Sequence, residues 1–477
     1  MSGQVRVCMI LEGSYPYVLG GVSSWMHQYI QAMPDTEFVL WCIGASAAKR
    51  GKFRYELPAN VTEVQEVFLD RAPVLKYRRR EPEKIHCSGA QIGELCHLAR
   101  GERTDWDVLF AMFQEQRINP AALLASPDFL EMIVDICRQQ YPYLPFTEYF
   151  HTVRSMLLPE LYLLTGRVPE ADLYHAASTG YGGLLGSLGK WKYHSGFVLT
   201  EHGIYTRERE EELLRAEWVL PRFRQQWMQL FYNFSDCAYR HADRVTALFA
   251  QANETQIELG CPREKVRVIE NGVHADAYCR IPPKQENGWI DIGAIVRIAR
   301  IKDIRTMIYA FADVKAAVPN ARLHILGGVD DREYYEECLE LADHLQVEDL
   351  LFCGVVDVRE YLEQLDFTVL SSISEGQPLA VLESLAAARP VVATDVGCCR
   401  ELLEGAGEEE TAGICVPPMQ REQLAQAMIR LCRDASGRRK MGQAGRARVA
   451  HHYTHAQSME KYQSLYREVM ELGGNRI

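Results

Sequence analysis

Two glutamates in the last third of the sequence, Glu375 and Glu383, stand where they could bind a ligand carrying both hydroxyl and phosphate groups. An apolar run from Phe367 has the pattern of a buried strand, and a short loop then leads into a helix that should carry Glu383 about two turns from its start. A helix N-terminus offers unpaired backbone N–H groups and partial positive charge, which suit a diphosphate. Carboxylate oxygens accept hydrogen bonds from sugar hydroxyls. Glutamates at this spacing also occur by chance in acidic chains, so it is the surrounding strand, loop and helix that indicate a nucleotide sugar.

A second candidate site lies near the beginning of the sequence, in the phrase EGSYPYVLGGVSSWMHQ that starts at Glu12. The phrase connects a predicted buried strand to a helix expected from about Val22. Gly20 and Gly21 directly precede that helix, and glycine lets backbone N–H groups approach a phosphate because it has no Cβ. A plain tight turn would contain the same two glycines. We expect Gly20, Gly21 and Val22 to contact the nucleotide sugar, which would be the sugar donor.

A third phrase, ADLYHAASTGYGGLLG, resembles a dinucleotide-binding fingerprint because Gly180, Gly182 and Gly186 follow a strand. The spacing is G-x-G-x-x-x-G instead of G-x-G-x-x-G, and the region where a ribose-binding acid would lie holds Lys190-Trp191-Lys192. We therefore expect a glycine-rich loop near the molecule that accepts the sugar, with an NAD site as the alternative. Further on, Asn271-Gly272-Val273 is expected to be an ordinary turn.

The elements that must position these residues alternate between strand-like and helical patterns, which predicts an α/β chain with parallel sheets. A polar, proline-bearing stretch from Ile281 to Gly288 is the best domain boundary. We predict two Rossmann-like, doubly wound domains that face one another across a cleft. The predicted boundaries are 1–282 for the first domain, with a helical elaboration at about 53–170, 283–454 for the second, and a last helix, 455–477, that crosses back to the first. Within the elaboration, the basic run Lys76–Arg80 is expected to be a solvated face.

The phrase from Phe367 resembles the E-x7-E motif of family 4 retaining glycosyltransferases, which have the GT-B fold. The resemblance extends over the second predicted domain, including IVRIARIKDIRTMIYAF. It implies that Glu375 contacts the hydroxyls of the donor sugar and that Glu383 contacts the nucleotide ribose. It also implies that Arg297 and Lys302 bind the donor phosphates, where fixed cations stabilise the charge that grows on the leaving group. The alternative is that these two cations merely solvate a loop.

Other site residues follow from the same resemblance. His202, in the phrase TEHG at the end of a strand, would lie beside the donor sugar, although most histidines are structural. Arg207 and Arg209 could reach the donor or acceptor, but for Arg209 we favour pairing with the acidic run Glu210–Glu212. The loop residues expected to line the donor are Gly376, Gln377, Pro378 and Leu379.

The phrase from Glu12 is similar to the opening of glycosyltransferases of Pel exopolysaccharide biosynthesis, with its E-G-x-Y-P-x-x-x-G-G-V-S-S-W pattern. That similarity implies transfer of a hexosyl unit from UDP-glucose or a UDP-N-acetylhexosamine to a growing Pel-type exopolysaccharide. It also fits the enlarged first domain. Inner-membrane subunits of a polysaccharide synthase would then be partners.

The composition of the chain excludes further classes of protein function. The chain has 477 residues and a formal net charge of −12, which argues against broad nucleic-acid binding. None of the fourteen cysteines forms a C-x-x-C pair, so we expect reduced thiols and a cytoplasmic protein, at most peripheral to the inner membrane. No D-x-D metal motif follows a strand, and Asp330-Asp331 is expected to cap a helix, so we expect no metal ion or other cofactor.

Three alternatives remain open from the sequence. A sugar-nucleotide epimerase of the same fold would consume its substrate without an acceptor. A dehydrogenase built on the glycine phrase from Ala171 would bind NAD. A non-catalytic subunit of a polysaccharide synthase would bind a nucleotide sugar without turning it over.

Overall fold

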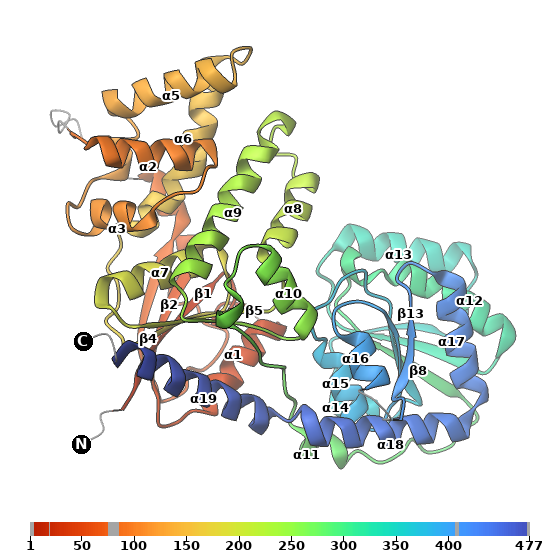
Figure 1. The fold of residues 1–477 in the computed structure, drawn as a ribbon. Helices are drawn as coiled ribbons and strands as arrows, with labels where there is room; N and C mark the ends of the chain where they lie inside the picture. The colour runs from red at the N-terminus through yellow and green to blue at the C-terminus, as the bar shows by residue number, and fades with distance from the viewer. Residues whose placement is uncertain (1–3, 19, 75–84, 406–409, 475–477) are drawn as a thin grey trace. The chain divides into compact units, whose positions relative to one another are not determined.

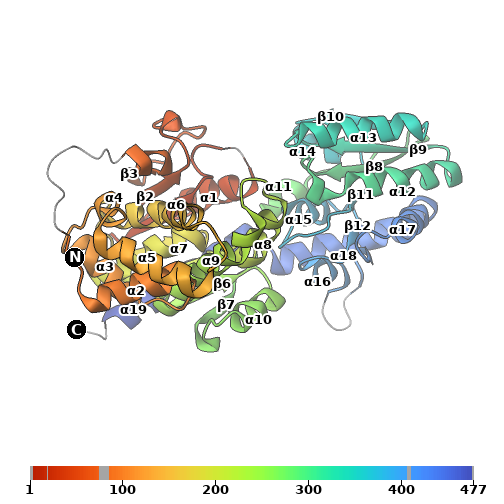
Figure 2. The same cartoon turned by 90° about the horizontal axis from the view of Figure 1, so that it is seen from above.

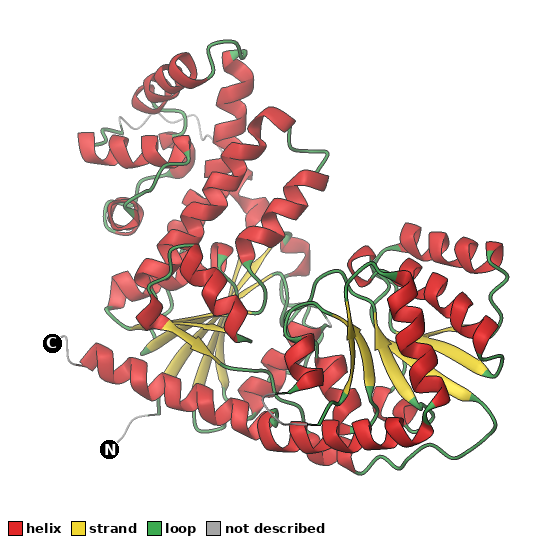
Figure 3. Ribbon diagram, turned by 45° about the vertical axis from the view of Figure 1, so that its right-hand side comes forward, coloured by secondary structure: helices red, strands yellow, loops and turns green. Residues whose placement is uncertain are grey.

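The computed structural model describes residues 4–18, 20–74, 85–405 and 410–474. The chain divides into two compact units: unit 1 comprises Met1–Val268 with Tyr462–Ile477, and unit 2 comprises Ile269–Lys461. Each unit is a parallel β-sheet flanked by helices (Figures 1 and 3). The basic run Lys76–Arg80 lies outside the described residues.

The sheet of unit 1 has seven parallel strands in the order β3-β2-β1-β4-β5-β6-β7. Its central strands are apolar on both faces, as parallel strands covered by helices must be; Val7–Leu11 and Phe38–Ile43 are buried. The order reverses between β1 and β4, and ligands of doubly wound sheets bind at the carboxyl ends of the strands at such a point. The strands are β1 (Arg6–Glu12), β2 (Glu37–Gly44), β3 (Val61–Phe68), β4 (Leu173–Ala176), β5 (Gly196–Glu201), β6 (Arg244–Ala247) and β7 (Val266–Val268).

Between β3 and β4 the described residues form five α-helices that gather beside one another (Figures 1 and 2). They are α2 (Gly89–Arg100), α3 (Trp106–Gln114), α4 (Pro120–Leu123), α5 (Pro127–Gln140) and α6 (Phe146–Leu164). Polar residues begin four of them: Ser88, Asp105, Asn119 and Ser126 each accept a backbone N–H of the following turn. The predicted start of this elaboration at residue 53 is wrong, because Val61–Phe68 is an edge strand of the sheet. The strand was not predicted because its sequence, VTEVQEVF, mixes polar with apolar residues.

Further helices of unit 1 pack on the sheet or on one another. They are α1 (Gly21–Gln31), α7 (Gly180–Tyr193), α8 (Tyr205–Arg215), α9 (Arg224–His241) and α10 (Ala250–Glu258). The glycine phrase predicted as a loop is therefore wrong in its conformation: Gly182 and Gly186 lie inside α7 and are buried. A Cβ at Gly186 would overlap the ring of Phe197, so this glycine lets the helix pack closely on the sheet.

The sheet of unit 2 has six parallel strands in the order β10-β9-β8-β11-β12-β13, which is the same doubly wound arrangement. The strands are β8 (Ile290–Ile295), β9 (Ala321–Leu326), β10 (Leu350–Gly354), β11 (Phe367–Leu370), β12 (Val391–Thr394) and β13 (Gly413–Val416). The helices are α11 (Ala275–Cys279), α12 (Ile304–Ala317), α13 (Arg332–His344), α14 (Val358–Leu362), α15 (Leu379–Ala386), α16 (Cys399–Glu404), α17 (Arg421–Arg433) and α18 (Ala435–His452). The order again reverses beside the first strand, between β8 and β11.

The units divide at Val268/Ile269, earlier than the boundary predicted at 282/283. The reason is that the segment 269–289, which we call the connector, packs on unit 2. Ile281 of the connector lies in a buried apolar cluster with Leu326, Leu362 and Leu365. Composition marks where a segment is polar, but not which core its few apolar residues join.

The helix expected at the end of the chain is α19 (His455–Gly474). Its residues from Tyr462 onward group with unit 1. There the Tyr29 hydroxyl donates to the Tyr466 hydroxyl at 2.6 Å, and the Tyr466 oxygen lies 2.6 Å from Nδ1 of His175 on β4. The end of the chain therefore completes the buried polar core of unit 1.

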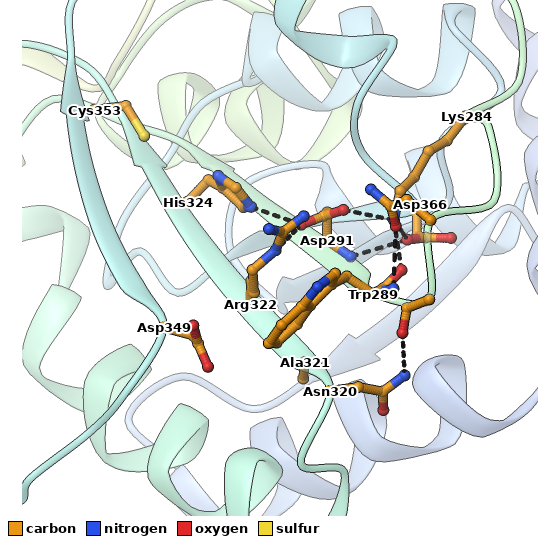
Figure 4. Close-up of polar contacts among 12 residues, drawn as sticks. Lys284, Trp289, Asp291, Asn320, Ala321, Arg322, His324, Asp349, Cys353 and Asp366 are labelled. Atoms are coloured by element: carbon orange, nitrogen blue, oxygen red, sulfur yellow. Dashed lines mark hydrogen bonds and ion pairs between the residues drawn. The ribbon is translucent and has the colours of Figure 1, made fainter.

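A buried charge network joins the connector to the amino ends of the unit 2 strands (Figure 4). The Lys284 Nζ atom lies 2.5 Å from Asp291 and 2.6 Å from Asp366. Asp291 also accepts from Arg322 Nε at 2.6 Å and lies 2.9 Å from His324 Nε2. Burial alone would raise the pKa of Asp291, but the hydrogen bonds from His324, Arg322 and Lys284 outweigh it and hold that pKa below its usual range.

The fourteen cysteines carry free thiols. Among the helices of the described residues, none is both long enough and apolar enough to span a membrane.

Candidate functional site

The ion pair between Lys302 and Glu375 is the centre of the candidate site in unit 2. Lys302 ends a short turn, Arg300–Lys302, that follows β8, and Glu375 lies in the loop after β11. The Lys302 Nζ and Glu375 Oε1 atoms are 2.6 Å apart, with the side chains 16% and 12% exposed. Ser372 Oγ donates to the same carboxylate oxygen at 2.6 Å. Because β8 and β11 are adjacent parallel strands, their carboxyl ends bring these two predicted residues together.

The backbone around this pair is fixed by further hydrogen bonds. Ser371 Oγ donates to the carbonyl oxygens of Lys302 at 2.8 Å and Asp303 at 3.1 Å. The Ile373 N–H donates to the Ile301 carbonyl at 2.9 Å. The turn after β8 and the loop after β11 therefore form one unit, and the charged groups are held in place before any ligand arrives. Such preorganised charges are the ones that stabilise a transition state effectively.

The loop residues Gly376, Gln377 and Pro378 lead into α15, which begins at Leu379. Pro378 is the N-cap, and no described side chain caps this helix. Gln377 is buried, and its Oε1 atom accepts the backbone N–H of Asn271 at 2.5 Å. The predicted donor loop therefore has a fixed shape and leaves the N-terminus of α15 without a protein cap, as an anion site requires.

Glu383 is the fifth residue of α15, about one turn from its start. The predicted distance of two turns is wrong, because Gly376–Pro378 stay in the loop. There the Gly376 carbonyl accepts the N–H of Cys398 at 3.0 Å. Burial raises the pKa of Glu383, and the Tyr278 hydroxyl and the charge of Arg359 partly offset that rise.

Arg297 also follows β8, but in the structure its side chain is paired with another residue of the chain. It forms an ion pair with Asp330, and its side chain is 62% exposed. The neighbouring Asp331 caps α13 by accepting the Tyr334 N–H at 2.9 Å, which confirms the predicted cap. Phosphate binding by Arg297 stays a prediction and would require the exchange of Asp330 for the ligand.

His202 lies in unit 1, directly after β5. Its ring packs edge-to-face on Trp25 of α1, with ring centroids 4.6 Å apart. Burial lowers the pKa of His202 to about 4, so the imidazole is neutral around neutral pH. Its Nε2 atom is buried and has no hydrogen-bond partner among the described residues. A neutral imidazole with an unused nitrogen can exchange a hydrogen bond with a ligand hydroxyl, and its predicted place beside the donor sugar stays a prediction.

Gly20 and Gly21 begin α1 in unit 1, with Gly20 extended at the N-cap position. A Cβ built on either glycine would meet no described atom within 4 Å, so packing does not require glycine there. Val22, in the first turn of the helix, is 36% exposed. Contact of these three residues with the donor stays a prediction.

The N-terminus of α7, where a dinucleotide would bind, is occupied by a side chain of the protein. The carboxylate of Glu12, at the end of β1, lies against the first turn of α7, where its Oε2 atom would be 3.0 Å from a Cβ added to Gly180. Burial raises the pKa of Glu12, and the charge of Arg209 and the nearby backbone N–H groups of Gly182 and Tyr181 partly offset the rise. A cofactor phosphate would compete with this carboxylate, so the geometry does not favour the NAD alternative.

A pocket of about 440 Å³ lies beside α8 in unit 1. Arg209 of this helix pairs with Glu212 at 2.6 Å, which confirms that predicted pairing. Trp218 is 63% exposed, and Trp227 packs against its ring edge-to-face with centroids 5.2 Å apart. An exposed aromatic ring beside carboxylates offers an apolar platform and hydrogen-bond acceptors, the two features that a sugar ring can use. The pocket is lined by Glu208, Glu211, Glu212, Arg215, Ala216 and Trp218.

Sequence reasoning missed two connector residues that contact the candidate site, Asn271 and Tyr278. Asn271 was expected in an ordinary turn, and it instead fixes Gln377. The Tyr278 hydroxyl, 105 positions earlier in the sequence, lowers the pKa of the Glu383 carboxyl. The Asn-Gly pair after a strand is the only signal that could have pointed to the first, and the pattern gives none for the second.

Two family models match the chain. The model described as a domain of unknown function, DUF3492, matches residues 5–264, which is more than half of the chain. The model described as glycosyl transferases group 1 matches residues 290–434. The second match contains Lys302, Glu375 and Glu383.

Curated relatives match part of the chain. The alpha-monoglucosyldiacylglycerol synthase of Streptococcus pneumoniae is 29% identical over 202 residues, which cover 36% of this chain and 45% of that protein. The N-acetyl-alpha-D-glucosaminyl L-malate synthase of Bacillus anthracis is 27% identical over 48% of this chain and 60% of its own length. The chain thus spans about half the length of these relatives.

Solved structures match over nearly the whole chain and show the fold. Anabaena Alr3699/HepE, solved in complex with UDP, has a TM-score of 0.61 at 14% identity over 97% of this chain and 99% of that chain. Sucrose-phosphate synthase of Thermosynechococcus elongatus has a TM-score of 0.62 at 16% identity over 98% and 100%. Both sheets, their strand order and these neighbours confirm the predicted GT-B class with two Rossmann-like domains. The chain therefore belongs to the DUF3492 family, and its residues 290–434 match the model described as glycosyl transferases group 1.

Proposed function

We propose that this chain is a retaining glycosyltransferase that moves a hexosyl unit from a UDP-sugar to a growing saccharide. The observation that carries the proposal is the Lys302–Glu375 pair beside the uncapped N-terminus of α15, with Glu383 one turn further along that helix. The group 1 match over residues 290–434 supports it. So does the fold shared with Anabaena HepE, which has been solved in complex with UDP-glucose.

The arrangement assigns one part of the donor to each group. Glu383 accepts from the ribose hydroxyls, and the diphosphate lies at the N-terminus of α15, beside Gly376–Leu379. Among the described residues, the two side chains that donate to Glu375 both engage Oε1, which leaves Oε2 to accept from a hydroxyl of the donor sugar. Lys302 keeps one N–H on Glu375 and offers others to the phosphate, since an ammonium has three donors.

For the chemical step we propose a front-face displacement. The acceptor oxygen bonds to the anomeric carbon on the side from which the diphosphate leaves, and the anomeric carbon–phosphate oxygen bond breaks. The acceptor proton passes to the departing phosphate oxygen, so no protein carboxylate is needed as base. Lys302, Arg297 and the dipole of α15 stabilise the leaving-group charge without a metal ion or other cofactor. His202 orients a hydroxyl of the donor sugar.

For the acceptor we propose an exopolysaccharide, of Pel type because of the similar phrase from Glu12. UDP-glucose and UDP-N-acetylhexosamines are the candidate donors, and subunits of an inner-membrane polysaccharide synthase are the candidate partners. The pocket with Trp218 beside α8 supports a saccharide acceptor, because it combines an exposed aromatic ring with carboxylates.

Replacing Trp218 with alanine is expected to weaken acceptor binding about tenfold, because the platform for the sugar ring is lost. The measurement is calorimetric titration of the UDP-saturated protein with oligosaccharides of glucose and of N-acetylhexosamines. Tyr143→Ala is the matched control, since Tyr143 is an exposed aromatic residue of the same unit. Equal acceptor affinity in Trp218→Ala and wild type would remove this pocket from the acceptor site.

The donor proposal is tested by calorimetric titration with UDP, UDP-glucose, UDP-N-acetylglucosamine, UDP-N-acetylgalactosamine and NAD. We expect micromolar binding of UDP and of one UDP-sugar, and a loss of about a hundredfold in Glu383→Ala, because the hydrogen bonds to the ribose go with the carboxylate. Glu336→Ala, an exposed position on α13, is the control.

Each other outcome has a definite meaning. Absence of binding by every uridine nucleotide refutes the UDP-donor proposal, and NAD binding in its place restores the dehydrogenase. Consumption of UDP-N-acetylglucosamine without an acceptor indicates the epimerase. Tight UDP-sugar binding with no turnover against any acceptor indicates the non-catalytic subunit.

A further inference from the structure

The ring of His202 combines an unused polar atom with a close aromatic neighbour. Its Nε2 atom is buried and has no hydrogen-bond partner among the described residues. The ring packs edge-to-face on Trp25 of α1, with centroids 4.6 Å apart and ring planes inclined at 77°. The chain beside it is fixed, since the Glu201 side chain accepts hydrogen bonds from two buried side chains at 2.8 and 2.9 Å. Because no described residue bonds Nε2, the direction in which this atom points depends on packing against Trp25.

Trp25 is the last residue of the phrase that starts at Glu12, and it belongs to an aromatic cluster formed by Trp25, Tyr29 and Tyr462. The centroid of the Trp25 ring lies 5.0 Å from that of Tyr29, on the same helix, and 5.9 Å from that of Tyr462, on α19. The two tyrosine rings are 5.1 Å apart. The three residues are 6%, 0% and 1% exposed. A closely packed interior leaves a ring no room to swing, so the aromatic cluster gives Trp25 one position against His202.

Three other titratable groups lie close to His202. Both ring nitrogens of His175, on β4, are within hydrogen-bond distance of protein hydroxyls, at 2.6 and 2.7 Å, and burial lowers the pKa of His175 to about 3. The carboxylate of Glu201 is held by its two donors. Glu208 of α8 lies against Gly203, where its Oε1 atom would overlap an added Cβ. From α1 and α19, the aromatic cluster faces this region. Of the two imidazoles, that of His202 is therefore the one with an unused nitrogen.

We propose that Trp25 is a positioning residue for glycosyl transfer: its ring holds the His202 imidazole in the orientation that turns Nε2 toward a hydroxyl of the donor sugar. This inference rests on the proposed function, in which His202 orients that hydroxyl. Without the indole, the imidazole rotates about its side-chain bonds and presents Nε2 in several directions, which lowers the fraction of donor held in the reactive geometry. Tyr462 gives α19 a part in this support, because it packs on Trp25.

Trp25 also shields the imidazole from water. Burial lowers the pKa of His202 to about 4, so the ring is neutral around neutral pH. A smaller side chain at position 25 leaves space for water beside the ring, and the pKa then rises toward the ordinary histidine value of about 6.5. A protonated ring has no acceptor nitrogen. The acid limb of the pH profile of transfer should therefore move to higher pH when Trp25 is replaced.

The test compares wild type with Trp25→Leu, which keeps an apolar side chain and removes the flat ring. Transfer is measured with the UDP-sugar identified by titration, and UDP affinity is measured by calorimetry. We expect kcat to fall about 10- to 100-fold, because the reactive geometry is lost. UDP affinity should stay unchanged, since the groups proposed to bind UDP belong to unit 2. NMR titration of the His202 ring, assigned by its absence in His202→Gln, should give a pKa nearer to the ordinary value.

Two further variants separate positioning from a general loss of packing. If Trp25 acts through His202, the double variant Trp25→Leu/His202→Gln should be no slower than His202→Gln alone, because the two residues work as one unit. Trp25→Phe, whose smaller ring again packs on the imidazole, should give an intermediate kcat and an intermediate pKa of His202. Trp25→Phe carries the same comparisons alone if Trp25→Leu does not fold.

Trp106→Leu is the matched control, because Trp106 is a buried tryptophan of the same unit that packs against Phe110 and Phe234. It should leave kcat and the titration of His202 as in the wild type. If the wild type transfers sugar and Trp25→Leu keeps the wild-type kcat and His202 titration, or loses no more activity than Trp106→Leu, the inference fails while the proposed function stands. If the wild type binds no uridine nucleotide and transfers no sugar, both fail together.

Discussion

Replacement of Lys302 by alanine is expected to lower kcat/KM for glycosyl transfer by about 100- to 1,000-fold, because the donor loses a fixed cation at the leaving phosphate. Lys302 is mostly buried and held by Glu375 at 2.6 Å, so a solvent cation cannot reproduce its position. Glu375→Ala is expected to lower kcat/KM by a similar factor. It removes both the carboxylate that accepts a hydrogen bond from the donor sugar and the ion-pair partner of Lys302. Steady-state transfer with the donor identified by titration measures both effects.

The losses of activity caused by the two substitutions should not multiply in the double variant. Residues that act as a unit show strongly non-additive losses, so the double variant should be little worse than either single variant. Lys315→Ala is the matched control, since Lys315 is a partly buried lysine of the same unit paired with Asp349 instead of a site residue. Near-normal turnover in Lys302→Ala, with the control also normal, would remove Lys302 from the reaction.

The second large effect concerns stability. Lys284→Ala is expected to destabilise unit 2 by about 3 kcal/mol, because it leaves the carboxylates of Asp291 and Asp366 in the interior with one fewer partner. Lys284 is only 8% exposed and touches both carboxylates. Hydrogen exchange of peptides from β8 and β9 measures the loss, and we expect about a hundredfold faster exchange in those strands.

The control for stability is an ion pair of the same kind on the surface. Lys440→Ala removes a 2.9 Å pair with Glu410 whose side chains are 71% and 59% exposed, and such pairs contribute less than about 1 kcal/mol. Exchange rates that match between Lys284→Ala and Lys440→Ala would show that the buried network does not stabilise the unit.

The stability that is lost in Lys284→Ala is also expected to depend on pH. The pKa of Asp291 is held below its usual range in the folded chain, so its ionised form contributes stability above the ordinary carboxyl pKa and loses that contribution as the pH falls. The difference between wild type and Lys284→Ala should therefore shrink in acid.

The sequence by itself predicted most of the buried strands and a candidate site in the loop after β11. Apolar runs such as Val7–Leu11 predicted buried parallel strands, because parallel strands are covered on both faces. The loop from Ser371 to Pro378 and the helix after it predicted an anion site, and Asp331 was predicted as a cap. These features depend on neighbours within a few positions, which is why local pattern reveals them. The edge strand β3 was missed, since a strand exposed on one side carries a polar sequence.

Only the tertiary structure decided which of these residues meet. Lys302 and Glu375 lie 73 positions apart, and adjacent strands β8 and β11 bring them to 2.6 Å. Glycines 182 and 186, which the pattern placed in a loop near the acceptor, are buried inside α7, and Glu12 occupies the start of that helix. Asn271 donates to Gln377 because the connector packs on unit 2. Such contacts depend on chain crossing and side-chain packing over a hundred positions, and no periodicity or spacing in the sequence encodes them.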